Sequence, residues 1–570
     1  MRLMTGTIAL FVFVTVGCNQ SNPAAPASQN ATAATGHSGA HPAGAPAARA
    51  TLLGNLGSYH RAITTSNADA QKFFDEGLTL LYGFNHEESF RSFERAAALD
   101  ARAPMPHWGM SLALGTNYND TATPDRLQQA HMHLTHAHER AANGSDIERA
   151  LIDALAKRYV AQPGDGKQPA REQAYASAMR EVSTRFPDDL DAATLAAESM
   201  MNLRPWKLYA IDGAPAPGTN EIVTTLEGVL KRNPEHPGAN HYYIHAVEAS
   251  RSPERALVSA KRLDSLVPGA GHLVHMPAHI YQRTGDYRAA ANSNKVAATV
   301  DEKYVKETGA TGMYPMMYYG HNLQFLSAAA MMAGNLAEAR EAARKTAALV
   351  EPMAGEMLML QPFAMQEALA LVRFGRWDDV LATPRPAFDS AQGKPARPLQ
   401  TALYHYTQGA AHAAKGNTQA AEQEAKNLAA ITFAPDEMVS LVNPVAAVMA
   451  VAREDLAGRI ALAKQDTRGA IAAFTRATAK EDTLAYNEPP DWLLPEREQL
   501  GTALLRAGRA GEAEKVFRAD LERNRQNPRA LFGLWKALEK QGKTAEAAEA
   551  RTAFEAAWQG ADVTLTMEPL

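Results

Sequence analysis

Apolar side chains recur every three or four positions along most of the chain, from about residue 56 to about residue 560. This spacing is typical of amphipathic helices, which bury one apolar face and expose the other. No segment alternates apolar and polar residues for long enough to predict a half-buried strand, so we expect no sheet domain. The pattern predicts an all-α protein whose folded part covers residues 56–560.

The helical pattern also repeats at an interval of 34 residues, with small and large side chains at fixed places. One copy contains Leu500, Gly501, Leu504, Gly508, Ala513 and Phe517. The next copy lies 34 residues later and contains Leu534, Trp535, Leu538, Gly542 and Ala547. Near the N-terminus, the same spacing is formed by Phe73, Gly77, Leu80, Ser89, Phe93 and Ala96. Unrelated helical hairpins would explain the helices but not a recurring frame, so we predict a repeat array.

These positions resemble the tetratricopeptide repeat, a helical hairpin in which small residues let two helices approach closely. Weaker copies centred on Gly334, Gly375 and Gly416 extend the resemblance over most of the chain. The resemblance implies an α-solenoid, a right-handed superhelix of helical hairpins. Two segments interrupt the frame, residues 309–320 and 486–492, and the paired prolines of the second cannot continue a helix. We predict a loop at each.

The N-terminus reads as a secretion signal that ends at the single cysteine of the chain. Residues 1–17 carry one positive charge, at Arg2, followed by an apolar stretch too short to span a bilayer. The sequence TVGC resembles the lipobox of bacterial lipoproteins, although Thr15 stands where leucine is usual. The resemblance implies that residues 1–17 are removed and that Cys18 carries the lipid. An ordinary secretion signal with an incidental cysteine is the alternative.

Residues 18–55 consist mostly of Ala, Pro, Ser, Gly and Thr without a hydrophobic period, which predicts a disordered tether. A tether that starts at a lipidated Cys18 would hold the folded part next to a lipid bilayer. By resemblance to bacterial lipoproteins, Asn19 after the cysteine implies the periplasmic face of the outer membrane rather than the inner membrane. We therefore expect a lipid-anchored protein of the cell envelope.

Charge and motif content narrow the classes of partner and chemistry. The formal net charge is -5 and the chain has no long basic run, so we expect no nucleic-acid partner. A single cysteine excludes an internal disulfide and a thiolate metal cluster. The sequence has no phosphate-binding glycine loop, no G-x-S-x-G and no H-E-x-x-H. These absences favour a non-catalytic role and leave a metal-dependent enzyme open.

Four histidines form two pairs with the spacing of one helical turn. The segment HYYIH contains His241 and His245, and the segment HMPAH contains His275 and His279. Residues four apart project from the same side of a helix. The second pair follows the first after 34 residues, so the pairs are expected at equivalent places on successive repeats. Pro277, inside the second pair, is expected to start or kink a helix there.

In tetratricopeptide proteins the first helix of each repeat lines the concave groove, so the resemblance implies that these imidazoles face one hollow. Neighbouring helices lie about 8 to 10 Å apart, a gap that two imidazoles can close around an ion with bonds of about 2.0 Å. His272 lies one turn before His275, and His321 takes the same place in the next repeat. The predicted zinc or copper site consists of His241, His245, His275, His279 and His321, with His272, Glu248 and Glu488 as further candidates.

Three more features bear on this site. If the array curls far enough to bring segment 486–492 to the histidines, either Glu488 or Asp491 would be placed as a general base beside a metal-bound water. Asn294 stands where the repeat prefers an aromatic side chain, which indicates either altered packing or a polar contact with the site. Nearby methionines such as Met276 and Met313 keep copper(I) among the candidate ions.

The sequence leaves two functions open. The first is a lipid-anchored scaffold that faces the periplasm and binds an extended or helical segment of a protein partner in its concave groove. The second is a metal carrier or metal-dependent enzyme that uses the histidine site. Histidines in repeat grooves also bind peptide carboxylates or hydrogen-bond to tyrosines, so the pattern alone does not decide between the two functions.

Overall fold

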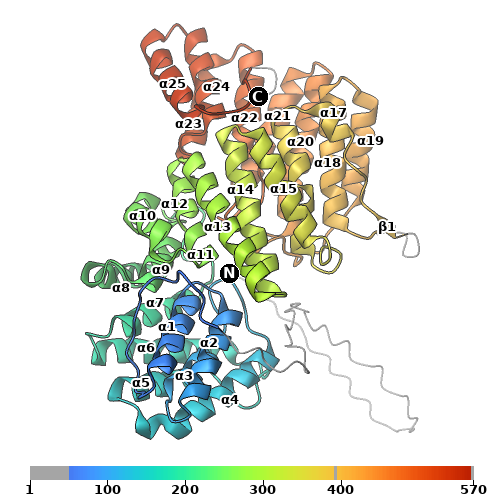
Figure 1. Ribbon diagram of the computed structural model, residues 1–570. Coiled ribbons are helices and arrows are strands. Elements are labelled where there is room, and N and C mark those ends of the chain that lie inside the picture. The colour runs from blue at the N-terminus through green and yellow to red at the C-terminus, as the bar shows by residue number, and fades with distance from the viewer. Residues whose placement is uncertain (1–50, 390–393, 567–570) are drawn as a thin grey trace, which may run out of the picture. The chain divides into compact units, whose positions relative to one another are not determined.

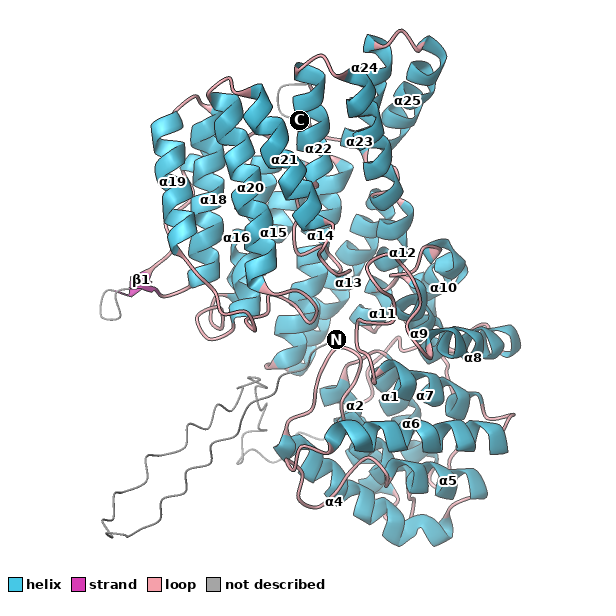
Figure 2. Cartoon of the chain, turned by 180° about the vertical axis from the view of Figure 1, so that it is seen from behind, coloured by secondary structure: helices cyan, strands magenta, loops and turns pink. Residues whose placement is uncertain are grey.

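Helices make up nearly all of the regular secondary structure (Figure 1, Figure 2). The computed structural model describes residues 51–389 and 394–566, which fall within one unit of the chain. Within these ranges the strands are β1 (Phe388–Asp389) and β2 (Lys394–Pro395), which pair antiparallel. The all-α prediction is therefore confirmed. No helix in the described ranges has the length and apolar character needed to cross a bilayer.

The helices follow one another along the chain, most of them after a short connection and some after a longer one, such as residues 202–218 and 482–495. The first are α1 (Ala68–Tyr82), α2 (His86–Leu99), α3 (Met105–Ala113), α4 (Pro124–Arg140), η1 (Ala141–Asn143), α5 (Asp146–Leu155), α6 (Gln168–Arg185), α7 (Leu190–Met201) and α8 (Thr219–Arg232). The central ones are α9 (Pro237–Val247), η2 (Pro253–Ala256), α10 (Leu257–Leu266), α11 (Gly271–His275), α12 (Pro277–Thr284), α13 (Tyr287–Thr308), η3 (Tyr314–Tyr319) and α14 (Gly320–Ala333). The last are α15 (Leu336–Val350), η4 (Leu358–Leu360), α16 (Gln361–Arg373), α17 (Trp377–Leu381), α18 (Pro398–Ala414), α19 (Thr418–Ala430), α20 (Val445–Ala463), α21 (Thr467–Glu481), α22 (Glu496–Arg506), α23 (Ala510–Arg523), α24 (Pro528–Lys540) and α25 (Thr544–Ala557).

Successive helices pair across short turns, as the 34-residue frame predicts. Helix α1 packs on α2, α14 on α15, α18 on α19, α20 on α21 and α24 on α25. The turns at Gly334, Gly375 and Gly416 have positive φ angles of 81°, 65° and 77°. Glycine adopts this conformation without the steric cost of a Cβ, so these residues can end one helix and start the next within a few positions. The chain is an all-helical array of tetratricopeptide-like hairpins.

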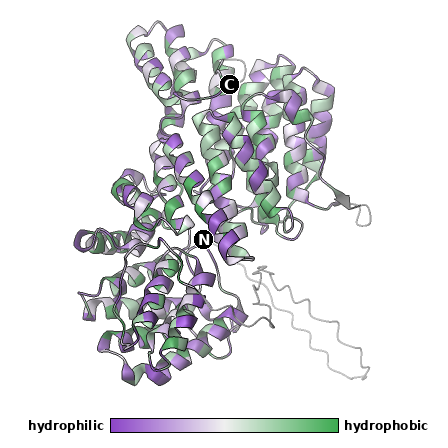
Figure 3. Ribbon diagram, in the orientation of Figure 1, coloured by the Kyte–Doolittle hydropathy of each residue, from purple (hydrophilic) through white to green (hydrophobic). Residues whose placement is uncertain are grey.

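Aromatic side chains fill the crossing points between helices at both ends of the array. A Cβ placed on Gly77 or on Gly109 would come within 2.7 Å of the ring of Phe93. The ring of Phe517 lies against Gly501 and Gly533 in the same way, at 2.4 and 2.2 Å. Glycine is therefore needed at these crossings, which explains the small residues of the repeat pattern. Figure 3 shows hydrophobic and hydrophilic residues interleaved along most helices, as amphipathic packing requires.

The loop predicted at residues 309–320 is wrong for its second half. From Tyr314 the chain forms the π-helix η3, which continues directly into α14. The ring of Tyr314 lies 5.5 Å from the ring of Tyr304 and 5.2 Å from that of Tyr318. These aromatic contacts order a segment whose glycines and prolines indicate a loop. Residues 486–492, the second predicted loop, contain no helix.

The predicted signal segment, Cys18 and tether residues 18–50 lie outside the described residues. Tether residues 51–55 are described, and they contact the helices. The amide of Leu53 donates to Glu76 Oε2 at 2.6 Å, and the carbonyl of Asn55 accepts from the amide of Gly269 at 2.7 Å. These contacts extend the folded part of the chain to before residue 56.

Candidate metal centre

Six histidines from four helices lie together in what we call the histidine cluster: His241, His245, His272, His275, His279 and His321. Helix α9 supplies His241 and His245, α11 supplies His272 and His275, α12 supplies His279, and α14 supplies His321. The first five are at most 2% exposed, and His321 is half-buried. The structure thus brings together all five predicted histidine ligands and the further candidate His272. The cluster is a buried site rather than an open surface, and metal binding itself stays a prediction.

Pro277 does not separate the second histidine pair. It ends α11 and starts α12, with Met276 between the two helices. The Nε2 atoms of His275 and His279 nevertheless lie only 2.8 Å apart. On the neighbouring helix, the ring centroids of His241 and His245 are 4.9 Å apart. Each pair therefore presents two imidazoles to the same space, as the spacing of four residues predicts.

Backbone and amide oxygens fix the orientation of two imidazoles. The Nδ1–H of His241 donates to the carbonyl of Tyr82 at 2.5 Å. The Nδ1–H of His275 donates to Asn294 Oδ1 at 2.6 Å, while Asn294 Nδ2 donates to the carbonyl of Ala290 at 2.9 Å. Because the second bond fixes which way the amide points, His275 must be the donor. The polar contact that Asn294 indicates in the sequence is present.

A single carboxylate orients two more imidazoles. Glu248 accepts from His245 Nδ1 at 2.7 Å through Oε1 and from His279 Nδ1 through Oε2. Burial by itself raises the pKa of Glu248, but His279 and His245 together outweigh burial and lower this pKa to about 2. Glu248 is therefore an anion at neutral pH, although it is 1% exposed. It acts on the cluster by holding histidines rather than through a free oxygen.

These orientations leave unshared lone pairs in the centre of the cluster. A neutral imidazole that donates through Nδ1 carries only a lone pair at Nε2. With both rings neutral, His275 and His279 turn two lone pairs toward each other at 2.8 Å, whereas a protonated His279 donates its Nε2–H to His275 Nε2. The Nε2 of His245 is buried without a hydrogen-bond partner. Facing lone pairs repel, so the arrangement is stable only with a proton or a metal ion between them.

Burial keeps most of the cluster uncharged. It lowers the pKa values of His241, His272 and His275 well below the ordinary range, and nearby histidines lower them further. The pKa of His321 falls to about 3, through burial first and His279 second. Burial also acts on His279, but the charge of Glu248 outweighs it and raises the pKa of His279. Neutral imidazoles are the form that binds metal ions.

The irregular segment 486–492 reaches the cluster through Tyr486. The Tyr486 hydroxyl lies 3.2 Å from Glu248 Oε2 and 2.5 Å from Glu488 Oε1. Burial raises the pKa of Glu488 to about 7, so this carboxyl is partly protonated at neutral pH. The Tyr486 hydroxyl donates to Glu488 Oε1, and Glu248 Oε2 is a second acceptor within its reach. Asp491 of the same segment instead accepts from Ser440, Asn443 and Asn487.

Aromatic rings outside the predicted ligand set surround the histidines. The ring of Phe84 lies 4.5 Å from that of His241, Trp206 lies 5.6 Å from His245, and Tyr318 lies 4.9 Å from His272. They exclude water and lower the local dielectric. Trp206 ends the segment NLRPW, residues 202–206, and a tryptophan after a proline in a non-helical segment is a signal that points to this ring. Phe84 follows α1 at a positive φ of 56° and carries no such signal.

No protein-family model and no curated protein matches the sequence. Several solved structures align over most of the chain. The human IFIT1 dimer with m7Gppp-AAAA is 14% identical, with 86% of this chain and 91% of that chain covered and a TM-score of 0.30. The P58(IPK) TPR domain is 13% identical, with 84% of this chain and 99% of that chain covered and a TM-score of 0.24. Yeast Tom70 is 12% identical, with 85% of this chain and 96% of that chain covered and a TM-score of 0.30. Such values carry neither the partner nor the activity of these proteins to this chain.

Proposed function

We propose that this chain is a transition-metal-binding protein built on a tetratricopeptide-like helical array. One observation carries the proposal: four buried imidazoles direct Nδ1 to fixed acceptors, so that in the neutral ring each Nε2 is a lone pair inside the cluster. Acceptors of this kind orient metal-bound histidines and raise their basicity. A metal ion would replace the repulsion between the Nε2 lone pairs with coordinate bonds.

The chemistry of the donors favours zinc or copper. Neutral imidazoles suit both ions, whereas magnesium and calcium prefer oxygen ligands. Met313 and Met317 pack around Val350 in a separate apolar cluster, whereas Met276 is buried in the core between α11 and α12. A metal carrier and a metal-dependent enzyme would use the same histidines, and Tyr486 and Glu488 add groups that exchange protons beside them.

The helical array also fits a protein-interaction scaffold, because stacked hairpins present extended surfaces to partners. The buried histidines are not such a surface, so a protein or peptide partner would contact other residues. We further propose that a lipid on Cys18 holds the array at the cell envelope, on the periplasmic face of the outer membrane. This assignment rests on the lipobox-like sequence TVGC.

Metal analysis of the full chain, purified without a histidine tag, tests the metal proposal. The protein is stripped with a chelator, reloaded with Zn²⁺ or Cu²⁺, dialysed and measured by elemental mass spectrometry. We expect stoichiometric metal in the wild type and its loss in the double variant His245→Ala/His279→Ala. The matched control is His131→Ala/His136→Ala on α4, whose histidines lie outside the cluster.

Absence of retained metal in the reloaded wild type would overturn the proposal. A metal content that is the same in wild type and cluster variant would also overturn it. In either case a proton shared by His275 and His279 would be the explanation for their 2.8 Å contact. Circular dichroism of each variant shows whether the helices are retained.

A further inference from the structure

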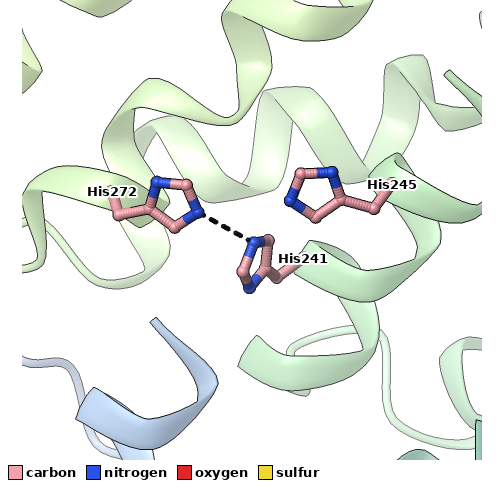
Figure 4. A group of neighbouring side chains, drawn as sticks. All are labelled: His241, His245 and His272. Carbon is pink, nitrogen blue, oxygen red and sulfur yellow. Dashed lines mark hydrogen bonds between the residues drawn. The ribbon is translucent and has the colours of Figure 1, made fainter. Parts of the chain in front are cut away.

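The histidine cluster contains two copies of one arrangement. We call His241, His245 and His272 the first triad, and His275, His279 and His321 the second triad (Figure 4 shows the first). In the first triad the ring centroids are separated by 4.9, 4.9 and 6.3 Å. In the second triad the equivalent separations are 4.7, 4.8 and 6.3 Å. The two triangles of imidazoles are therefore nearly the same size and shape.

The repeat explains this duplication. The first two histidines of each triad are four residues apart, and these two pairs are offset by the 34-residue repeat, whereas His272 and His321 are 49 residues apart. The third histidine is in both cases the second residue of a helix that begins with glycine, His272 in α11 and His321 in α14. Equivalent positions of successive hairpins point in the same direction, so each triad combines two histidines of one hairpin with one histidine from the first helix of the next.

Each triad is complete enough to hold an ion alone. One ring nitrogen from each member lies within 4.8 Å of those of the other two. Three histidines that leave a further position open form a common protein site for zinc, with bonds of about 2.0 to 2.1 Å. Small rotations of the side chains would close these nitrogens around an ion of that size. No member has to be shared between the triads.

We propose that the histidine cluster holds two metal ions, one in the first triad and one in the second triad. This inference rests on the proposed function, because it assumes that the cluster binds metal. It assigns Zn²⁺ or copper as the ligand of both triads and gives a stoichiometry of two ions per chain.

Glu248 provides the negative charge that two neighbouring cations need. The triads adjoin each other, with ring centroids 5.4 Å apart between His245 and His279 and 5.5 Å apart between His272 and His275. Glu248 accepts from one histidine of each triad, His245 and His279. It is thus placed to offset the repulsion between the ions and to couple the orientation of one triad to that of the other.

A single ion held by His245, Glu248 and His279 is the competing arrangement, since these three also lie close enough together. In that arrangement Glu248 is a ligand. In the structure both of its oxygens accept from histidine Nδ1 atoms, which turns the Nε2 lone pairs of His245 and His279 away from the carboxylate. The hydrogen bonds therefore favour two ions over one.

The experiment measures how many ions the full chain retains when one triad is removed. The stripped protein is equilibrated with Cu²⁺ by dialysis, and bound copper is counted per chain. The variant His241→Ala/His272→Ala disables the first triad, and His275→Ala/His321→Ala disables the second. Both variants keep His245 and His279, so the hydrogen bonds of Glu248 are preserved. We expect two ions in the wild type, one in each double variant and none in the fourfold variant.

Electron paramagnetic resonance of the Cu²⁺-loaded protein gives a second, independent measurement. Two adjacent Cu²⁺ ions interact magnetically, so we expect a broadened or weakened spectrum. The signal of an isolated ion should return in each double variant. The control variant His131→Ala/His136→Ala should retain two ions and the wild-type spectrum.

Each outcome separates this inference from the proposed function. One ion in the wild type with the spectrum of an isolated ion, lost in either double variant, would overturn the two-ion inference and keep the metal proposal. No retained ion in the wild type would overturn both. Two ions that persist in the fourfold variant would place the metal outside the cluster and would also overturn both.

Discussion

Replacing Glu248 with glutamine tests whether the oriented imidazoles are what make the site bind metal. In the wild type the carboxylate accepts from His245 Nδ1 and from His279 Nδ1. The amide of glutamine has the same shape but a single acceptor oxygen. One of the two histidines would therefore face an N–H group, and its ring would turn or take up the other tautomer. The change also removes a buried negative charge beside the cluster.

The expected effect is a loss of metal affinity with retention of the fold. Removing one such orienting acceptor typically weakens metal binding 10- to 100-fold, which is about 1.4 to 2.7 kcal/mol. Because Glu248 contacts one histidine of each triad, we expect the loss at both triads. We place the total effect of Glu248→Gln at the upper end of that range, since the lost charge adds to the lost hydrogen bond.

Competition with a coloured chelator of known affinity gives the dissociation constant for Zn²⁺ in wild type and variant. The matched control is Glu424→Gln, because Glu424 accepts from His405 Nδ1 at 2.5 Å outside the cluster. That variant removes the same kind of pair without touching the site. We expect its zinc affinity to equal that of the wild type.

Two results would refute the reasoning. Wild-type affinity in a folded Glu248→Gln protein would show that the Nδ1 acceptors do not control binding. An equal loss in Glu424→Gln would show that any glutamate-to-glutamine change acts through general stability. Thermal unfolding of both variants without metal separates these cases.

Three other predictions concern the fold and its anchor. Burial raises the pKa of the Asp301 carboxyl to about 7. Between about pH 4 and pH 7 this carboxyl is therefore protonated in the folded state and ionised in the unfolded state. The contribution of Asp301 to the free energy of unfolding falls by up to about 1.4 kcal/mol per pH unit as the pH rises through that window. Urea unfolding should therefore show that the stability of Asp301→Asn, relative to the wild type, increases from pH 5 to pH 8. A difference in stability that is independent of pH would contradict this. Gly533→Ala should lower the free energy of unfolding by about 1 to 3 kcal/mol because its Cβ would lie 2.2 Å from the Phe517 ring, whereas Gly228→Ala, which meets nothing within 4 Å, should raise it by up to about 1 kcal/mol. Cys18→Ser should move the protein from the membrane fraction to the soluble fraction, and unchanged fractionation would disprove the lipid anchor.

The sequence predicted the features that depend on neighbouring repeats. The 34-residue frame places His241 with His275 and His245 with His279, because equivalent positions of stacked hairpins face the same way. The turns at Gly334 and Gly375 follow from the same frame. The local sequence pattern was less informative about the segments that connect one hairpin to the next. Residues 314–319 are helical because tyrosine rings pack together, and no turn or helix signal of the segment contains that information.

The tertiary structure alone decided the contacts that span several repeats. His241 pairs with the carbonyl of Tyr82, 159 residues away, and Tyr486 meets Glu248 across 238 residues. Such contacts depend on the small rotation between each hairpin and the next, summed over many hairpins, and a periodic sequence does not specify that rotation. The sequence by itself thus determined which imidazoles are equivalent. The packing determined which groups orient them, how deeply they are buried and which way their lone pairs point.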